Sequence, residues 1–341
     1  MGIDLLSIQP HKVSRSLEGY TVLFYGEPKT GKTTIASQFP KALLLAFETG
    51  YLAIPGIMAQ PINKWSEFKQ VLKQLKDPVV HEQFSNIIVD TADIAYDLCE
   101  KYTCNQKGVS AINEVPYGQG WALAGKEFDE CLRSIPQMGY GLVMISHSQD
   151  KTFKDENGAE FNQIVPTLGN KPRLIVDRMS DIIGYAHPVE QEDGIRTYLE
   201  MRGTSRYVAG SRFKYTPQRI AFTYDNLVNA IGDAIDMQAK ENNGTLVTDE
   251  RTKAYEVAPE EDFNELMAQV RTMISKIQTN VPKEEFNKTW KHTITEITDK
   301  YLGAGKKIND CTPAQTEQLS LIASDLADVI GKMINFDQAV Q

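Results

Sequence analysis

Short apolar runs alternate with helix-forming segments from the start of the chain to about residue 236. The runs that predict strands are 20–25 (YTVLFY), 42–47 (ALLLAF), 86–90 (NIIVD), 140–146 (YGLVMIS), 181–187 (DIIGYAH) and 196–202 (RTYLEMR). The segments 34–39, 66–77 and 125–139 between them predict helices. Continuous apolar strands that alternate with helices are typical of a parallel sheet covered on both faces. We therefore predict an α/β fold with a doubly wound, mainly parallel sheet.

The pattern changes after residue 236. Residues 237–262 are polar, contain Asn-Asn-Gly and end in an acidic cluster, which is typical of a linker. Three segments with apolar stripes follow and predict a small helical domain. We divide the chain into an N-terminal arm (1–19), an α/β core (20–236), an acidic linker (237–262) and a helical C-terminal domain (263–341).

Composition narrows the class of protein. The 341 residues are 41% apolar and 24% charged, as in ordinary globular chains. No apolar run approaches the ~20 residues that span a bilayer, and the N-terminus lacks the basic and apolar regions of a secretory signal. The four cysteines have no metal-binding spacing and are expected to be reduced thiols. We expect a cytoplasmic protein that has no membrane partner.

The net charge of −9 is unevenly distributed. Residues 201–224 contain Arg202, Arg206, Arg212, Lys214 and Arg219 and no acidic residue. Such a basic stripe suits phosphate binding or a subunit contact. A solvated strand edge protected by charge is the alternative.

Residues 26–33 (GEPKTGKT) match the P-loop pattern GxxxxGK[ST], with a predicted strand before and a helix after. In such a loop, backbone N–H groups surround the phosphates of ATP, the lysine reaches the β- and γ-phosphates, and the Ser/Thr hydroxyl binds Mg²⁺. We assign the lysine role to Lys32 and the metal role to Thr33. The residues expected to contact the nucleotide are Gly26, Glu27, Pro28, Lys29, Thr30, Gly31, Lys32, Thr33 and Thr34.

Polar residues end three of the other predicted strands. Asp90 follows NIIV and is the candidate carboxylate for Mg²⁺, although it could instead cap a turn or helix. No glutamate follows Asp90 directly, but Glu48 follows ALLLAF and is the candidate base that orients the attacking water, with a surface-loop role as the alternative. Ser146 and His147 end YGLVMIS, where ligands of open α/β sheets bind. His147 is a candidate γ-phosphate contact, or else a structural histidine.

Together these motifs resemble the RecA-like core. A glutamate on the strand after the P-loop helix is the arrangement of RecA and the hexameric replicative helicases, whereas AAA+ proteins carry it beside the Walker B aspartate. Residues 20–235 more closely resemble the phage AAA-type family that includes short RecA-like single-strand annealing ATPases. YGQGW (117–121), the ISHS strand end and AGSRF (209–213) carry this resemblance.

The resemblance implies a phage recombination or replication ATPase that binds single-stranded DNA and acts with a single-strand-binding protein. It also implies a homo-oligomer in which a neighbouring subunit supplies a cationic finger to the ATP site. Arg212 corresponds to that finger, although Gly210 departs from the expected K-x-R pattern. Arg202, Arg206 and Lys214 are possible substitutes, and a solvent-facing strand is the alternative.

The expected DNA contacts are the segments that match RecA-like loops, 105–120 and 149–173. The second mixes basic residues with Phe153, which suits backbone tracking and base stacking, but its ENGA could equally be a hairpin turn without a partner. Lys306 and Lys307 in the C-terminal domain could contact DNA, or the helices could simply form a cap.

Three functions remain open from the sequence: an ATP-driven annealing or strand-exchange protein, an annealing module that uses nucleotide only as a switch, and a P-loop kinase. Arg133 is the only arginine between Arg15 and Arg173, so the arginine-rich lid of a kinase has no counterpart in that part of the chain.

Overall fold

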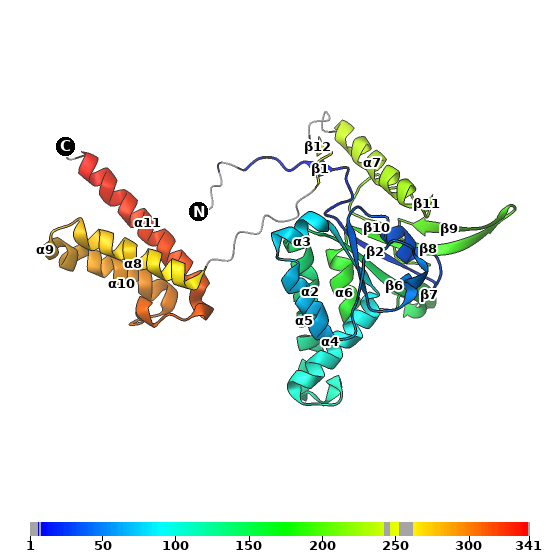
Figure 1. The fold of residues 1–341 in the computed structure, drawn as a ribbon, viewed down its shortest axis with the longest axis horizontal. Coiled ribbons are helices and arrows are strands. Elements are labelled where there is room, and N and C mark those ends of the chain that lie inside the picture. Colours follow the sequence, from blue (N-terminus) through cyan, green and yellow to red (C-terminus); the bar gives the residue numbers. More distant parts are fainter. Residues whose placement is uncertain (1–5, 7, 242–245, 252–261, 340–341) are drawn as a thin grey trace. The chain divides into compact units, whose positions relative to one another are not determined.

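The computed structural model describes residues 6, 8–241, 246–251 and 262–339, and the chain divides into two compact units (Figure 1). One unit, residues 9–257, contains the large sheet. The other, formed mainly by residues 258–341, is helical. The predicted α/β class with a helical C-terminal region is confirmed.

A parallel array of six strands forms the centre of the sheet, in the order β8-β2-β6-β5-β3-β4. The bounds of these strands are β2 Thr21–Gly26, β3 Ala42–Ala46, β4 Ala59–Pro61, β5 Asn86–Asp90, β6 Gly141–Lys154 and β8 Ile182–Gln191. Antiparallel strands extend it: β9 and β11 continue the sheet beyond β8, β10 also pairs with β8, and β7 pairs with β6. Their bounds are β7 Glu160–Pro166, β9 Gly194–Glu200, β10 Gly210–Ser211 and β11 Arg219–Ala221.

Helices cover both faces of the sheet because the central strands are apolar on both sides. One face packs against α2 (Trp65–Gln74), α3 (Pro78–Gln83), α4 (Ala92–Lys107), α5 (Gln119–Gln137) and α6 (Asn170–Met179). The other face packs against α1 (Lys32–Ala36) and α7 (Tyr224–Glu241). Alternate residues of β2 enter the two cores: Leu23 enters the first, and Val22 and Phe24 the second. Short 3₁₀ turns lie at Gly50–Ala53, Ile112–Glu114 and Pro116–Gly118.

Two strands continue beyond the sheet as hairpins. The β8–β9 hairpin projects from this unit in Figure 1. Strand β6 pairs with β2 up to His147 and then pairs with β7 from Ser148 to Lys154. The segment 149–173, which we expected to be a long loop, is therefore a hairpin followed by helix α6, and the ENGA sequence lies at its turn. Residues 105–120 comprise the end of α4, the two later 3₁₀ turns and the start of α5.

The ends of the larger unit depart from the expected arm and linker. Helix α7 continues to Glu241, whose carboxylate accepts a 2.8 Å hydrogen bond from the Lys214 ammonium group. Residues 237–241 are therefore helical. Strand β12 (Val247–Thr248) pairs in parallel with β1 (Val13–Ser14) of the arm. The remainder of the predicted linker, 242–245 and 252–261, and residues 1–5 and 7 of the arm lie outside the described residues.

The helical unit packs around its own apolar core. Its main helices are α8 (Phe263–Thr279), α10 (Lys291–Leu302) and α11 (Thr316–Ala339), and Val270, Leu319 and Leu326 are fully buried among them. Helix α9 (Lys283–Glu285) and a π-helical turn (Phe286–Trp290) lead into α10, and 3₁₀ turns at Ile308–Asp310 and Pro313–Gln315 lead into α11. A capping box formed by Thr312 and Gln315 begins the last of these helical segments.

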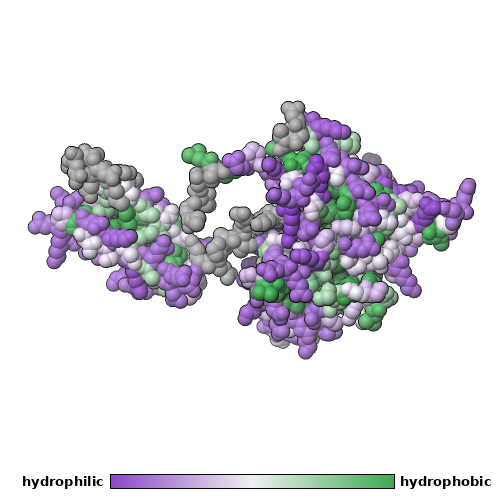
Figure 2. Space-filling model, turned by 45° about the horizontal axis from the view of Figure 1, so that its top comes forward, coloured by the Kyte–Doolittle hydropathy of each residue, from purple (hydrophilic) through white to green (hydrophobic). Residues whose placement is uncertain are grey.

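The surface is mainly hydrophilic. Figure 2 shows hydrophobic residues in small separate patches on the face that it presents. Within the described parts of the chain, no helix combines the length and apolarity needed to cross a bilayer. All four cysteines are free thiols.

Candidate nucleotide site

The P-loop occupies the turn between β2 and α1, and two glycines make that turn possible. A Cβ atom on Gly26 would lie 2.0 Å from the carbonyl oxygen of Ala186 on the neighbouring strand β8, so only glycine fits. Gly31 has a φ of 85° at the N-cap of α1, in the left-handed region that glycine adopts without strain. The loop therefore has the backbone form that its sequence pattern predicts.

Lys32 begins α1 and points back into the loop. Its ammonium group donates hydrogen bonds to the carbonyl oxygens of Gly26 (2.9 Å) and Glu27 (2.7 Å). Burial lowers the pKa of Lys32 to about 8, although the carboxylates of Asp90 and Glu48 oppose this shift. A buried ammonium group held by neutral carbonyls can form stronger, charge-assisted bonds with phosphate oxygens.

Thr33 and Asp90 are joined directly. The Thr33 hydroxyl donates a 2.7 Å hydrogen bond to Oδ2 of Asp90. Asp90 is 2% exposed, and burial raises its pKa to about 6 against the lowering effect of the Thr33 hydrogen bond. The other carboxylate oxygen, Oδ1, is buried and has no hydrogen-bond partner among the described residues.

These oxygens fit Mg²⁺, which is usually held by one or two protein oxygens together with waters and substrate phosphates. Thr33 Oγ1 and Asp90 would be the protein ligands, and the bound cation would shield the phosphate charge. Among the described residues no group of three His, Cys, Asp or Glu side chains could hold a metal by itself. A site completed by phosphates is consistent with that finding.

The sheet register places Glu48 and His147 at the same edge as Asp90. Ala46 of β3 is opposite Asp90 of β5, and the Phe47 N–H donates a 2.7 Å hydrogen bond to the Asp90 carbonyl oxygen. Across the sheet, His147 of β6 is opposite Gly26 of β2, where the P-loop begins. The carboxyl ends of all four strands thus converge around the loop.

Glu48 and His147 are close enough to interact. Nε2 of His147 lies 3.5 Å from Oε2 of Glu48, and both side chains are about one-third exposed (33% and 30%). The exposed part of each side chain leaves room for water or a substrate group. This geometry suits a base and a polar contact near the terminal phosphate; these two roles stay predictions.

Sequence reasoning missed a second carboxylate beside this edge. Asp93, in the first turn of α4, accepts hydrogen bonds at Oδ1 from the hydroxyls of Ser146 (3.0 Å) and Thr167. Burial raises the pKa of Asp93, and the bonds from Thr167 and Ser146 oppose the shift. Its position three residues after Asp90, at a helix start, was the available signal in the sequence. Nothing in the sequence marks Thr167.

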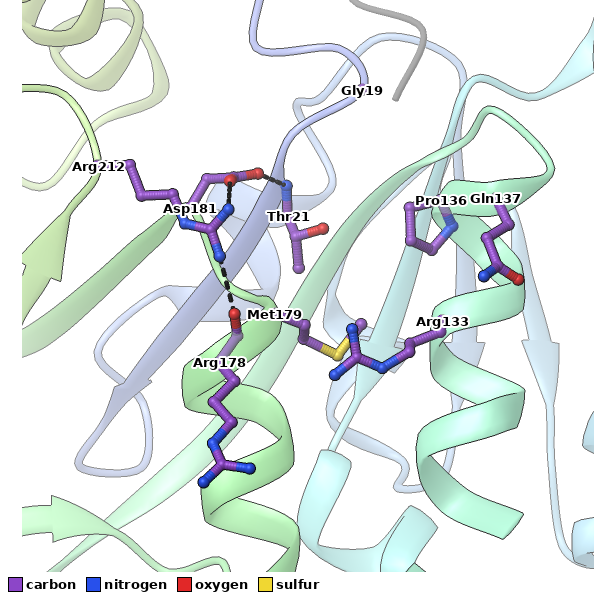
Figure 3. A pocket seen from close by; sticks show the side chains of 9 residues that line it. All are labelled: Gly19, Thr21, Arg133, Pro136, Gln137, Arg178, Met179, Asp181 and Arg212. Carbon is purple, nitrogen blue, oxygen red and sulfur yellow. Dashed lines mark hydrogen bonds and ion pairs between the residues drawn. The ribbon is translucent and has the colours of Figure 1, made fainter. Parts of the chain in front are cut away.

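Arg212 lies apart from these residues, at the opposite edge of the sheet, where β2 begins. Figure 3 shows it beside Asp181 and Thr21. Its guanidinium group pairs with Asp181 at 3.2 Å and donates a 2.8 Å hydrogen bond to the Arg178 carbonyl oxygen. Asp181 in turn binds the N–H of Thr21, the first residue of β2. The P-loop begins five residues further along β2, roughly 16 Å away at ~3.3 Å per residue. Arg212 is thus not brought together with the other predicted site residues of its own chain.

A cavity of about 230 Å³ lies at this edge. Arg212, Arg133 and Arg178 are among the residues that line it (Figure 3). The other basic candidates have different roles. Arg202 donates to the backbone carbonyl oxygens of Phe213 (3.0 Å), Lys214 and Thr216 (3.0 Å) and so holds that loop. Lys214 pairs with Glu241, whereas Arg206 is exposed.

Comparison with known proteins shows the family of the chain. Residues 18–213 match the model of a family of AAA domains. The chain is 31% identical over 340 residues to the SPbeta prophage-derived uncharacterized protein YorG of Bacillus subtilis (strain 168). The matched region covers 97% of this chain and 100% of that protein. The protein belongs to this AAA domain family, and its P-loop is the nucleotide-binding element of the domain.

Solved structures with a similar core are more distant. A KaiC-like protein from Pyrococcus horikoshii OT3 is 13% identical, with a TM-score of 0.32, over 57% of this chain and 89% of that one. The flagellar accessory protein FlaH from Methanocaldococcus jannaschii is 11% identical, with a TM-score of 0.31, over 63% and 86%. Such low TM-scores add nothing to the fold description, which rests on the strand order and the P-loop.

Proposed function

We propose that the protein is an ATP-hydrolysing recombination protein of phage origin that assembles on single-stranded DNA and promotes annealing or strand exchange. One observation carries the proposal. Strand β6 passes through Ser146 and His147 at the nucleotide edge and continues directly into the β6–β7 hairpin, which bears exposed aromatic and basic side chains. Strand β6 thus contributes residues both to the nucleotide site and to a surface suited to DNA.

The hairpin has an aromatic face, which we define as Gln149, Lys151 and Phe153 of β6 with Phe161 and Gln163 of β7. The rings of Phe153 and Phe161 stack across the strands with centroids 5.9 Å apart, and Phe161 is 38% exposed. The Lys151 ammonium group lies 5.5 Å from the centroid of the Phe153 ring. Neither ring belongs to a hydrophobic core among the described residues, so their stacking planes are available to nucleobases.

Charge is divided between the two faces of the hairpin. The register places Asp150, Lys154 and Glu160 on the face opposite the aromatic face, because side chains alternate along a strand. The aromatic face itself carries Lys151 and no acid. The Lys151 ammonium group binds Asn170 Oδ1 at 2.6 Å, which brings the aromatic face next to the start of α6 and its exposed Lys171. A phosphate backbone can follow this basic path while bases stack on the rings.

On the nucleotide side, Glu48 supplies the base that hydrolysis needs, beside the Thr33–Asp90 pair for Mg²⁺. His147 contacts Glu48 and directly precedes the hairpin, so it can report the state of the terminal phosphate to the DNA surface. Burial raises the pKa of Asp90, and a bound Mg²⁺ would lower it again because a cation stabilises the charged carboxylate.

The position of Arg212 supports the proposed assembly. Since it lies at the opposite edge of the sheet from the P-loop, a role of Arg212 in ATP hydrolysis would be at the nucleotide of a neighbouring subunit. Contacts between opposite edges of successive copies produce rings or filaments. The prophage-derived relative supports the phage origin, and a single-strand-binding protein is the expected partner on DNA.

Binding of a labelled single-stranded oligonucleotide, followed by fluorescence anisotropy, tests the proposal. Replacing both phenylalanines (Phe153→Ala with Phe161→Ala) removes the stacking rings and should weaken binding on the order of 10- to 100-fold, at ~1–3 kcal/mol for each stacked base. The matched control is the double variant Thr152→Ala with Asn162→Ala, a cross-strand pair on the other face joined by a 2.9 Å hydrogen bond.

The control should bind like the natural protein. Equal affinity of the control and the phenylalanine variant would remove the aromatic face from the account. Absence of single-stranded DNA binding by the natural protein, with and without Mg²⁺ and ATP, would contradict the proposed function.

A further inference from the structure

A cluster of hydrogen bonds around Asp93 lies beside the nucleotide edge and takes no part in the ATP chemistry described above. Oδ1 of Asp93 accepts bonds from the Ser146 hydroxyl at 3.0 Å and from the Thr167 hydroxyl. Thr167 is also held by the His147 carbonyl oxygen, which accepts a 2.9 Å hydrogen bond from the Thr167 N–H. One carboxylate thus binds side chains from two other elements.

Each partner in this cluster belongs to a different functional part of the molecule. Asp93 lies in the first turn of α4, three residues after Asp90. Ser146 is fully buried in β6 and precedes His147, which contacts Glu48. Thr167 is the first residue after β7, next to the pair Ser148–Pro166 that begins the hairpin. The Asp93 carboxylate therefore links the start of α4, which follows the strand ending at Asp90, to the base of the β6–β7 hairpin.

The cluster is also incompletely satisfied. Oδ2 of Asp93 is buried and has no hydrogen-bond partner among the described residues. Nδ1 of His147 is also buried and also has no partner among them. Unpaired buried polar atoms are costly, so a change that supplies them with partners is favourable. One of these atoms belongs to the residue that binds Ser146 and the other to the residue that follows it, so partners for both could come from a change at this one point of β6.

We propose that Asp93 is a positioning residue that couples occupation of the nucleotide site to the conformation of the β6–β7 hairpin, through its bonds to Ser146 and Thr167. This inference rests on the proposed function, because it assigns the regulation of the same site. Movement of His147 or Asp90 around Mg²⁺ and ATP shifts Ser146 and α4. The shared carboxylate transmits the shift to Thr167 and so to the hairpin that binds DNA.

The test uses Thr167, because its hydroxyl bonds Asp93 and, at 3.4 Å, the backbone carbonyl oxygen of His147, but no side chain of the nucleotide site or of the aromatic face. Thr167→Val keeps the shape and removes the hydroxyl, whereas Thr167→Ser keeps the hydroxyl. Thr152→Val is the matched control, since it removes a hairpin hydroxyl that binds Asn162 and not Asp93. Affinity for a single-stranded oligonucleotide is measured without nucleotide and with Mg²⁺ and a slowly hydrolysed ATP analogue.

The natural protein, Thr167→Ser and Thr152→Val should show a nucleotide-dependent change in DNA affinity, on the order of 10-fold for a typical coupling between sites. In Thr167→Val this ratio should fall toward one, while the affinity for the analogue and the nucleotide-free affinity for DNA stay unchanged. A purely structural role would instead lower thermal stability and leave the ratio intact. An undiminished ratio in stable Thr167→Val would overturn the inference while leaving the proposed function standing.

Failure of the proposed function gives a different result. If the natural protein binds no single-stranded DNA, the proposed function fails, and coupling is measured by hydrogen exchange of the β6–β7 amides with and without Mg²⁺ and the analogue. Nucleotide-dependent protection in the natural protein that disappears in Thr167→Val supports the inference. Protection that is absent in the natural protein, or unchanged in the variant, overturns it.

Discussion

The Thr33 hydroxyl and Oδ2 of Asp90 are joined by a 2.7 Å hydrogen bond, although the two residues lie 57 positions apart in the sequence. This bond connects α1, the helix that follows the P-loop, to the end of β5. In the sheet, β6 lies between β5 and β2, the strand that leads into the P-loop. It places two oxygen ligands where a phosphate-bound cation would lie. The predictions below start from this arrangement.

Removal of the P-loop ammonium group should abolish tight nucleotide binding. Lys32→Ala loses the charge that meets the β- and γ-phosphates, and hydrogen bonds to charged groups contribute ~1.5–3 kcal/mol, so ATP affinity should fall on the order of 100-fold. Isothermal titration measures the affinity, and thermal unfolding shows that the fold is retained. Lys73→Ala, an exposed lysine of α2, is the control and should bind ATP normally. Unchanged ATP binding by Lys32→Ala would remove the P-loop from the account.

Glu48→Gln should separate binding from hydrolysis. The amide cannot accept a proton from the attacking water, so turnover should fall by a factor of ~100 or more while ATP affinity is retained. Phosphate release and ATP binding are measured on the same preparation. Glu82→Gln, at an exposed position of α3, should leave both unchanged. If the Glu48 variant loses ATP binding and keeps its turnover per bound nucleotide, Glu48 is not the base.

Arg212→Ala should bind ATP but hydrolyse it poorly, because the P-loop of each subunit is intact and only the contribution to a neighbour is lost. Removal of such a finger typically costs on the order of 10³ in rate. Mixing this variant with Lys32→Ala should restore part of the activity, and turnover per subunit should rise with protein concentration. Arg196→Ala, on the β8–β9 hairpin, is the control. Lack of complementation together with concentration-independent turnover would argue against shared sites.

Glu200 should stabilise the fold in a pH-dependent manner. Its carboxylate is 1% exposed, and burial alone would raise its pKa, but hydrogen bonds from His187 (2.9 Å), Tyr207 (2.7 Å) and Arg219 (2.5 Å) lower it below the ordinary value. A lowered folded-state pKa means stability that is present above the unfolded value of about 4.3 and is lost as the pH falls through the folded-state value.

Glu200→Gln should therefore reduce the free energy of unfolding on the order of 3 kcal/mol at neutral pH. Urea denaturation across a pH series should show this difference shrinking below about pH 4. Glu190→Gln, exposed on the same hairpin, is the control. A difference that is constant with pH would show that the charge of Glu200 makes no contribution.

The sequence predicted the parts of the fold that depend on local pattern. The apolar runs that became β2, β3 and β5 are buried on both faces, so their composition alone identifies them, and the P-loop needs glycines at fixed positions. The same logic placed Glu48, Asp90 and His147 at strand ends. Their convergence follows from parallel register, which the α/β pattern already implies.

Features that depend on tertiary contacts could not be predicted in this way. The polar residues of β6 beyond His147 form a strand only because β7 pairs with them, so the segment resembled a loop. The linker begins later than predicted, because α7 continues to Glu241, which pairs with the distant Lys214. The Asp93–Thr167 bond joins residues 74 positions apart, and no local pattern marks it. Similarly, only the pairing of Arg212 with Asp181, which binds the first residue of β2, shows that Arg212 lies at the edge opposite the P-loop.

The most direct test of the central claim is steady-state ATP turnover measured with and without single-stranded DNA at several protein concentrations. The account predicts Mg²⁺-dependent turnover that increases several-fold on addition of single-stranded DNA, and an increase that disappears when Phe153 and Phe161 are both replaced by alanine. Turnover that is the same with and without single-stranded DNA, in a protein that binds both ATP and DNA, would contradict it.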